Sequence, residues 1–216
     1  MQPLQALAAT LAVFGVVAAL LAAVRSGRRR KLAALGHALL AGVLLWGAVW
    51  LWPIGTGIAG YDRLRDGQAV AELYFEQLGP GRFRVTMTRL PGGRMQVFDL
   101  GGDAWRVDAR TLHWRGWALE AGFEPRYQLD RLTGLDAADT QKTLPRTTYE
   151  LGEASGLKFW QQIRAGRYWR RVVEARVVYG PNAAMASGAR YEVVLSTQGL
   201  DARPINDAAA VGQAVH

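Results

Sequence analysis

Few side chains in this sequence have the types and spacing that catalysis or metal binding requires. The charged part of the chain, from Tyr61 onward, contains two histidines, His113 and the final residue His216. A metal site needs two or more His, Cys or carboxylate ligands at a suitable spacing. The sequence has no cysteine, no H-x-x-H or H-E-x-x-H motif and no EF-hand loop. We therefore expect no metal, no cofactor and no disulfide.

Carboxylates and serines give equally little support for an active site. Asp99, Asp103 and Asp108 resemble a cluster, but they flank an expected hairpin, where aspartates favour turns and strand ends. No serine lies in a G-x-S-x-G motif, and His113 would be the only internal base. The serines considered are Ser155, Ser187 and Ser196. The sequence predicts a non-enzymatic protein, and an enzyme that relies on His113 is the third alternative.

One segment combines arginine with aromatic residues in a pattern that suits an anionic surface. Guanidinium groups stack on aromatic rings and bind phosphate through paired donors. The contact residues that this segment offers to a lipid or a partner are Arg164, Arg167, Tyr168, Trp169, Arg170 and Arg171. The simpler alternative, which the sequence alone favours, is an amphipathic helix with a solvated basic face.

The first 60 residues contain two long apolar runs separated by a short basic cluster. The runs are residues 4–24 and 32–52, and each is long enough to cross the ~30 Å hydrocarbon core as a helix. A cleaved signal peptide is the alternative for the first run, but its apolar part is too long and no positive charge precedes it. The second run ends in Trp46, Trp50 and Trp52, which we expect to be membrane-interface anchors. We predict a transmembrane helical hairpin over 1–54.

The charges between the two runs predict the direction of the hairpin. Residues 1–60 contain no Asp or Glu, and their only Lys or Arg residues are Arg25, Arg28, Arg29, Arg30 and Lys31. Basic loops stay in the cytoplasm, so we expect loop 25–31 to be cytoplasmic. The rest of the chain would then be periplasmic, and the protein would lie in a bacterial inner membrane. The other 21 basic and all 18 acidic residues follow Gly60 and give only +3, which argues against nucleic-acid binding.

Small residues recur at spacings of three and four in both runs, which would let two helices approach closely. They are Ala8, Ala12, Gly15, Ala19 and Ala22 in the first run, and Ala34, Ala38, Ala41 and Gly42 in the second. Such a stripe could equally serve an oligomer or a helix of a partner. His37, the only ionisable residue within the second run, is expected to be a satisfied interfacial residue rather than a proton relay.

After a Gly-rich linker and hinge over 55–60, the apolar runs give way to alternation with a period of two. We predict strands over 69–78, 82–90, 94–100 and 104–109, joined by tight turns as a β-meander. Shorter strands are predicted at "LHWRGW", "RYQLDRL" and "RTTYEL", and a strong one at 189–196. A helical region over 157–178, divided at Gly166, interrupts the strands. The fold class is therefore a helical hairpin followed by an α+β, mostly antiparallel β domain over 61–206. This domain would be a small barrel or sandwich with one helical insertion, and 207–216 a frayed or weakly helical tail.

The whole chain resembles a group of uncharacterised proteobacterial two-span inner-membrane proteins, often named "cation/multidrug efflux pump" or "multidrug transporter". The resemblance rests on the hairpin with its Arg-rich turn, on "WRVDARTLHW" and on "GARYEVVLSTQGLDARPIN". It implies a two-span inner-membrane protein and suggests a link to transport.

The function expected from the residues is an anchored periplasmic domain that binds or helps assemble another cell-envelope component. Its partners would be the lipid bilayer and a membrane or periplasmic protein, or a second copy of the chain. The alternative is an oligomeric multidrug or cation transporter, or a subunit of one. A substrate path is usually marked by intramembrane charges or broken helices, and apart from His37 the two spans show neither, which argues against a self-contained pump.

Overall fold

A computed structural model describes residues 3–27, 31–120, 122–136, 145–152, 154–166, 169–196 and 198–214. The chain divides into two compact units. The first consists of the residues up to Tyr61 together with Glu153–Gln162, and the second of Asp62–Gly152 and Ile163–His216.

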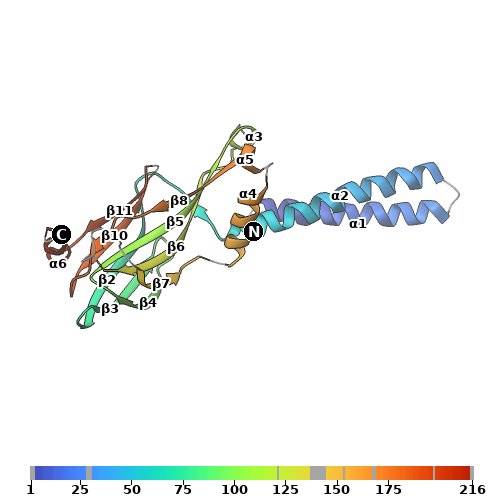
Figure 1. Ribbon diagram of the computed structural model, residues 1–216. Helices are drawn as coiled ribbons and strands as arrows, with labels where there is room; N and C mark the ends of the chain where they lie inside the picture. The colour runs from blue at the N-terminus through green and yellow to red at the C-terminus, as the bar shows by residue number, and fades with distance from the viewer. Residues whose placement is uncertain are drawn as a thin grey trace. The chain divides into compact units, whose positions relative to one another are not determined.

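The first unit contains two long antiparallel helices, α1 (Pro3–Gly27) and α2 (Lys31–Ala59) (Figure 1). Small residues line the contact between them, and those that are buried include Ala8, Gly15, Ala18, Ala34, Ala41 and Ala48. A Cβ atom added at Gly15 would lie 2.8 Å from the Leu45 side chain. The backbone of α1 at Gly15 therefore packs directly against Leu45 of α2. Of the predicted stripe, Ala19, Ala38 and Gly42 are exposed instead.

Both helices have the length and composition of membrane spans. Gln5–Ser26 and Lys31–Ala59 have mean hydropathies of 2.6 and 1.9 in their most apolar windows, of which only 17% and 11% is buried within the chain. The core helix of a water-soluble protein would be mostly buried. Large apolar side chains such as Leu20, Leu32 and Val43 are instead 62%, 88% and 67% exposed. The two helices could therefore span a membrane.

Helix α2 continues through the segment that we predicted as a linker. Residues 55–59 form its last turns, and Pro53 lies inside the helix. Packing explains the difference: a Cβ atom at Gly57 would overlap Phe159, which lies on α4 (Ala154–Ala165). Ile58 and Phe159 are each only 2% exposed. Burial against α4 stabilises these glycines in a helix, so residues 55–59 of the predicted Gly-rich linker are helical, and the hinge stays a prediction.

The second unit is a sandwich of two antiparallel sheets, not a closed barrel (Figure 1). The five-stranded sheet has the order β11-β10-β2-β3-β4, with bounds Leu200–Pro204, Arg190–Leu195, Gln68–Gly79, Arg82–Arg89 and Arg94–Gly101. The six-stranded sheet has the order β1-β6-β5-β8, with β7 beside β6 and β9 beside β5. These strands are β1 (Asp62–Arg63), β5 (Ala104–Trp114), β6 (Arg126–Leu135), β7 (Pro145–Glu150), β8 (Val173–Tyr179) and β9 (Ala183–Ala184).

The core lies between the two sheets and has an aromatic centre. Phe75, Trp105 and Tyr191 are at most 1% exposed, and their ring centroids lie 5.3–5.9 Å apart. The predicted alternation in β3 is confirmed, because its apolar side chains are buried between polar neighbours. The second unit also contains α3 (Trp117–Glu120), α5 (Trp169–Val172) and α6 (Asp207–Ala214). Ala209 of α6 is buried, so this part of the predicted tail is an ordered helix.

Two predictions about local structure are wrong. Strands β2, β3 and β4 form the meander, but β5 belongs to the other sheet, because 101–103 crosses between the sheets. Gly102 has a φ of +118°, and a Cβ atom there would overlap the Leu135 carbonyl oxygen. The predicted helix over 157–178 breaks at Gly166 as expected, but its last part is strand β8.

Candidate anion-binding site

The candidate site begins where β8 pairs with the end of β5. His113 lies opposite Glu174, and Thr111 lies opposite Arg176. Directly opposed residues in an antiparallel pair project to the same face, and so do residues two apart on one strand. The register therefore gathers these four side chains on one face of the six-stranded sheet.

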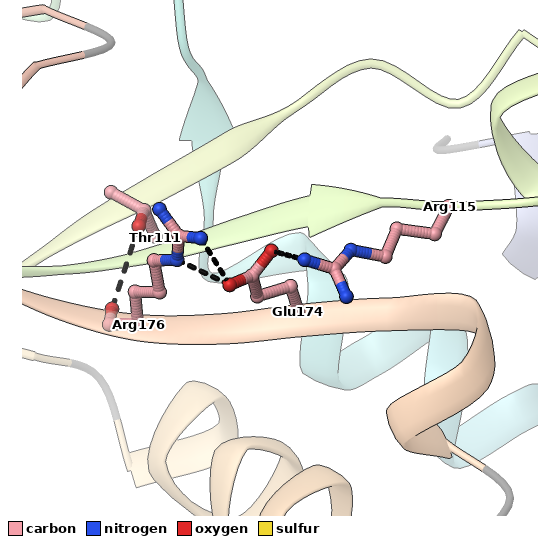
Figure 2. Close-up of polar contacts among 4 residues, drawn as sticks. All are labelled: Thr111, Arg115, Glu174 and Arg176. Atoms are coloured by element: carbon pink, nitrogen blue, oxygen red, sulfur yellow. Dashed lines mark hydrogen bonds and ion pairs between the residues drawn. The ribbon is translucent and has the colours of Figure 1, made fainter.

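Glu174 is held between two guanidinium groups (Figure 2). Arg115 donates to Oε2 of Glu174, and Arg176 donates to Oε1 through Nε while its Nη2 forms an ion pair with the same oxygen. Thr111 Oγ1 donates to the Arg176 carbonyl oxygen at 3.4 Å. Desolvation opposes ionisation of Glu174, but hydrogen bonds and charge from Arg176 and Arg115 lower its pKa overall. Glu174 is therefore a carboxylate at neutral pH.

His113 lies half-buried among the same charges. Burial lowers its pKa, the positive charges of Arg176 and Arg115 lower it further, and Glu174 acts in the opposite direction. The imidazole is therefore neutral at pH 7.

A cavity of about 380 Å³ opens beside this cluster along strand β8. Its polar lining comes from Arg115, Arg164, Arg170 and Glu174, and its apolar lining from Ile163, Val173 and Ala175. We call this cavity the arginine pocket. Ile163 and Val173 are each 1% exposed, whereas Arg164 and Arg170 are exposed at the rim. The pocket thus combines an apolar wall with three guanidinium groups and one carboxylate.

The charge of the arginine pocket is only partly neutralised. Arg115 shares Glu174 with Arg176. Within the described part of the chain, Arg164 and Arg170 have neither a hydrogen bond nor an ion pair from the side chain. With respect to the described residues, two guanidinium groups are therefore available to bind an anion, and a planar guanidinium fits the oxygens of phosphate or carboxylate.

The structure brings together only some of the residues predicted for a lipid or partner surface. Arg164 and Arg170 line the pocket, Arg171 is exposed outside it, and Trp169 is half-buried on α5. Arg167 and Tyr168 lie outside the described residues. The sequence reasoning missed Arg115 and Arg176, and it assigned Glu174 to a helix. The signal that could have found them is the alternation of "VVEARVVY", which places Glu174 and Arg176 on one side of a strand.

The residues predicted to orient the hairpin belong to the segment that connects α1 and α2, or to the adjoining helix ends. Arg25 is on the last turn of α1 and Lys31 begins α2, while Arg28, Arg29 and Arg30 lie outside the described residues. His37 has partners on both ring nitrogens: Nδ1 donates to the Ala33 carbonyl oxygen at 2.8 Å, and Nε2 accepts from Arg25. Such pairing agrees with the prediction of a satisfied interfacial residue.

The predicted interface anchors are exposed along α2. Trp46, Trp50 and Trp52 are 66%, 56% and 54% exposed, and the rings of Trp46 and Trp50 lie 5.8 Å apart. Their role at a membrane interface stays a prediction.

The other described residues considered for catalysis form ion pairs or hydrogen bonds that belong to the fold. Asp99 pairs with Arg84 at 3.2 Å, and Asp108 is 3% exposed beside Arg106 at 3.0 Å. Ser196 Oγ accepts from the backbone nitrogens of 198 and 199, and the side chains of Ser155 and His216 lie outside the described residues. Among the described residues, no group of three or more His, Asp or Glu side chains could hold a metal ion.

Comparisons with known proteins found no match to this chain among protein families, curated proteins or solved structures. The resemblance to two-span proteobacterial membrane proteins therefore stays a prediction.

Proposed function

We propose that this protein is a membrane-anchored binding module, in which the β-sandwich contacts an acidic component of the cell envelope through the arginine pocket. The observation that carries the proposal is the pair of guanidinium groups of Arg164 and Arg170, which have no described counter-charge beside an apolar wall. Binding an anion would neutralise two guanidinium charges that have no partner among the described residues.

The proposal includes a topology. Helices α1 and α2 cross a bacterial inner membrane, the loop that contains Arg25 and Lys31 is cytoplasmic, and the sandwich is periplasmic. It is supported by the two exposed apolar helices and by the restriction of basic residues in 1–60 to this loop.

A photo-crosslinking experiment in cells tests the proposed contact. A photoreactive amino acid replaces Arg171, which is exposed and follows Arg170 directly, so that Arg164 and Arg170 are both kept in the full-length protein. A matched variant carries it at Arg82, an exposed arginine on β3. We expect an adduct from position 171 and none, or a much weaker one, from position 82. Equal labelling at the two positions, or no adduct at 171, would show that the pocket is not the contact surface.

A further inference from the structure

The arginine pocket has the composition of a site for an amphiphile rather than for a small anion. An inorganic phosphate needs only the polar rim, whereas Ile163, Val173 and Ala175 add an apolar wall beside the guanidinium groups. A phospholipid headgroup presents a phosphate directly next to glycerol and acyl carbons. A single ligand of this class would satisfy both parts of the pocket.

Few residues of the chain separate the hairpin from the unit that contains the arginine pocket. Phe159 packs on Gly57 in the last turns of α2, and Arg164 follows Phe159 by five residues on the same helix, α4. Five residues of α-helix rise only about 7.5 Å. In addition, only Gly60 and Tyr61 separate α2 from β1. Because so few residues join the unit that contains the pocket to the hairpin that we propose spans the membrane, the chain connection gives phospholipid headgroups a high effective concentration for the pocket.

We infer that the arginine pocket binds the phosphate of an anionic phospholipid, through Arg164 and Arg170, and that Glu174 limits this binding by occupying Arg115. The inference rests on the proposed function, because it names the ligand class of the same pocket. Glu174 already provides Arg115 and Arg176 with the carboxylate oxygens that a phosphate would otherwise supply. Trp169, half-buried on α5, adds an indole of the kind favoured at membrane interfaces.

The test uses the full-length protein in an uncharged detergent. Native mass spectrometry follows titration with phosphatidylglycerol and with phosphatidylcholine of identical acyl chains. The pocket variant is Arg164→Glu with Arg170→Glu. The control is Arg82→Glu with Arg94→Glu, which makes the same charge change at two exposed arginines of the five-stranded sheet. The basic loop of the hairpin also attracts anionic lipid, but equally in both variants.

We expect the pocket variant to weaken phosphatidylglycerol binding by at least about tenfold, since each basic residue near an anionic surface contributes several-fold. The control should change it by less than about threefold, and neither variant should alter phosphatidylcholine binding. Replacing Glu174 with Gln should strengthen phosphatidylglycerol binding by about fivefold, because Arg115 then becomes available. Circular dichroism establishes that each variant keeps its strands.

Other outcomes would overturn the inference. These are equal losses in the pocket and control variants, equal affinity for the two lipids, or displacement of the lipid by millimolar inorganic phosphate. The crosslinking experiment tests the proposed function independently of the lipid titration, so either proposal can fail while the other survives. A protein adduct at position 171 without pocket-dependent lipid binding would retain the pocket as a contact surface and reject the lipid. Pocket-dependent phosphatidylglycerol binding in the titration without any adduct in cells would retain the lipid as ligand and reject the pocket as a contact surface for a protein.

Discussion

At the scale of single residues, the outer face of the six-stranded sheet buries carboxylates that depend on arginine. Asp130 is 2% exposed and pairs with Arg110, whose side chain is only 11% exposed. Arg131 also approaches Asp130, at 3.5 Å, but its side chain is 47% exposed. A charge buried to this degree is tolerated only when it is paired, so the ion pair with Arg110 offsets most of the desolvation cost of the Asp130 carboxylate.

Replacing Arg110 with Met should therefore destabilise the protein by about 3 kcal/mol, because it leaves the Asp130 carboxylate buried with one partial partner. Urea unfolding of the full-length protein in mild detergent, followed by tryptophan fluorescence, measures the loss. Adding Asp130→Leu should restore stability to within about 1 kcal/mol, since the unpaired charge is then gone. The matched exposed change, Arg203→Met, should matter by less than about 1 kcal/mol. A double variant as unstable as the single one would contradict this account.

His113 makes the stability of the second unit depend on pH. Its pKa is lowered in the folded state from a usual value of 6.5, so the unfolded chain binds the proton more readily. Stability should consequently fall as the pH is lowered from above 6.5 through the folded-state pKa, and most of the loss should lie below pH 6.5. Comparing Tm at pH 7.5 and pH 5.5 in the native chain and in His113→Gln measures this contribution. The variant should lose less stability on acidification, and an equal loss would exclude His113 as the cause.

At the scale of elements, the sequence predicted well wherever pairing is local. Strands β2, β3 and β4 are neighbours in the chain, and their alternation and turns were sufficient to place them. Strand β8 was predicted as helix because Val172, Val173 and Trp169 also fit a helical face. Its true partner, β5, lies about 60 residues earlier in the chain. No local pattern reports such a pairing.

In the candidate site, too, the sequence predicted the residues that are close together in the chain and missed those that only strand pairing brings together. Arg164 and Arg170 were found because they lie in one short basic-aromatic segment. Arg115 comes from another part of the chain and reaches Glu174 only through the register of β5 with β8. The helical conformation of 55–59 was missed for a related reason, since the contact between Gly57 and Phe159 joins segments about a hundred residues apart.

The crossover between the two sheets should be intolerant of any side chain at Gly102. Gly102→Ala introduces a Cβ atom that overlaps the Leu135 carbonyl oxygen and requires a φ of +118°. We expect a loss of more than about 3 kcal/mol in unfolding free energy. Gly67→Ala is the matched control: it also has a positive φ, +69°, but nothing lies within 4 Å, so only about 1 kcal/mol is expected. Similar losses in urea unfolding would show that sterics at the crossover are unimportant.

Close contact between α1 and α2 should depend on Gly15. The native chain has no cysteine, so a pair introduced at Leu11 and Gly47, which face each other across the helices, reports their separation by disulfide formation in membranes. Gly15→Leu adds a side chain where a Cβ atom alone would lie 2.8 Å from Leu45, and cross-linking should slow markedly. Gly36→Leu, where nothing lies within 4 Å, should leave the rate unchanged. Equal cross-linking rates in the cysteine-pair protein, with Gly15→Leu and with Gly36→Leu would mean that the stripe of small residues does not hold the helices together.

At the scale of the whole molecule, charge is distributed as the proposed membrane topology would require. Five basic and no acidic residues lie in 1–60, and all five are between or at the ends of the two apolar helices. The later residues carry both signs in nearly equal number, which suits a domain in water rather than in lipid. The orientation of everything after Ala59 should therefore depend on a handful of side chains.

Alkaline phosphatase fused after His216 should be active in a Gram-negative host, because this reporter matures only in the periplasm, where its disulfides form. A fusion after Gly27, between the two helices, should be inactive and serves as the matched control. Replacing Arg25, Arg28, Arg29, Arg30 and Lys31 with neutral residues removes the charges that, in the proposed topology, retain the loop in the cytoplasm, so both fusions should then show intermediate activity. Full activity after Gly27 together with none after His216 would reverse the proposed topology. The arginine pocket would then lie in the cytoplasm, and the cytoplasm would be the compartment in which its ligand must be sought.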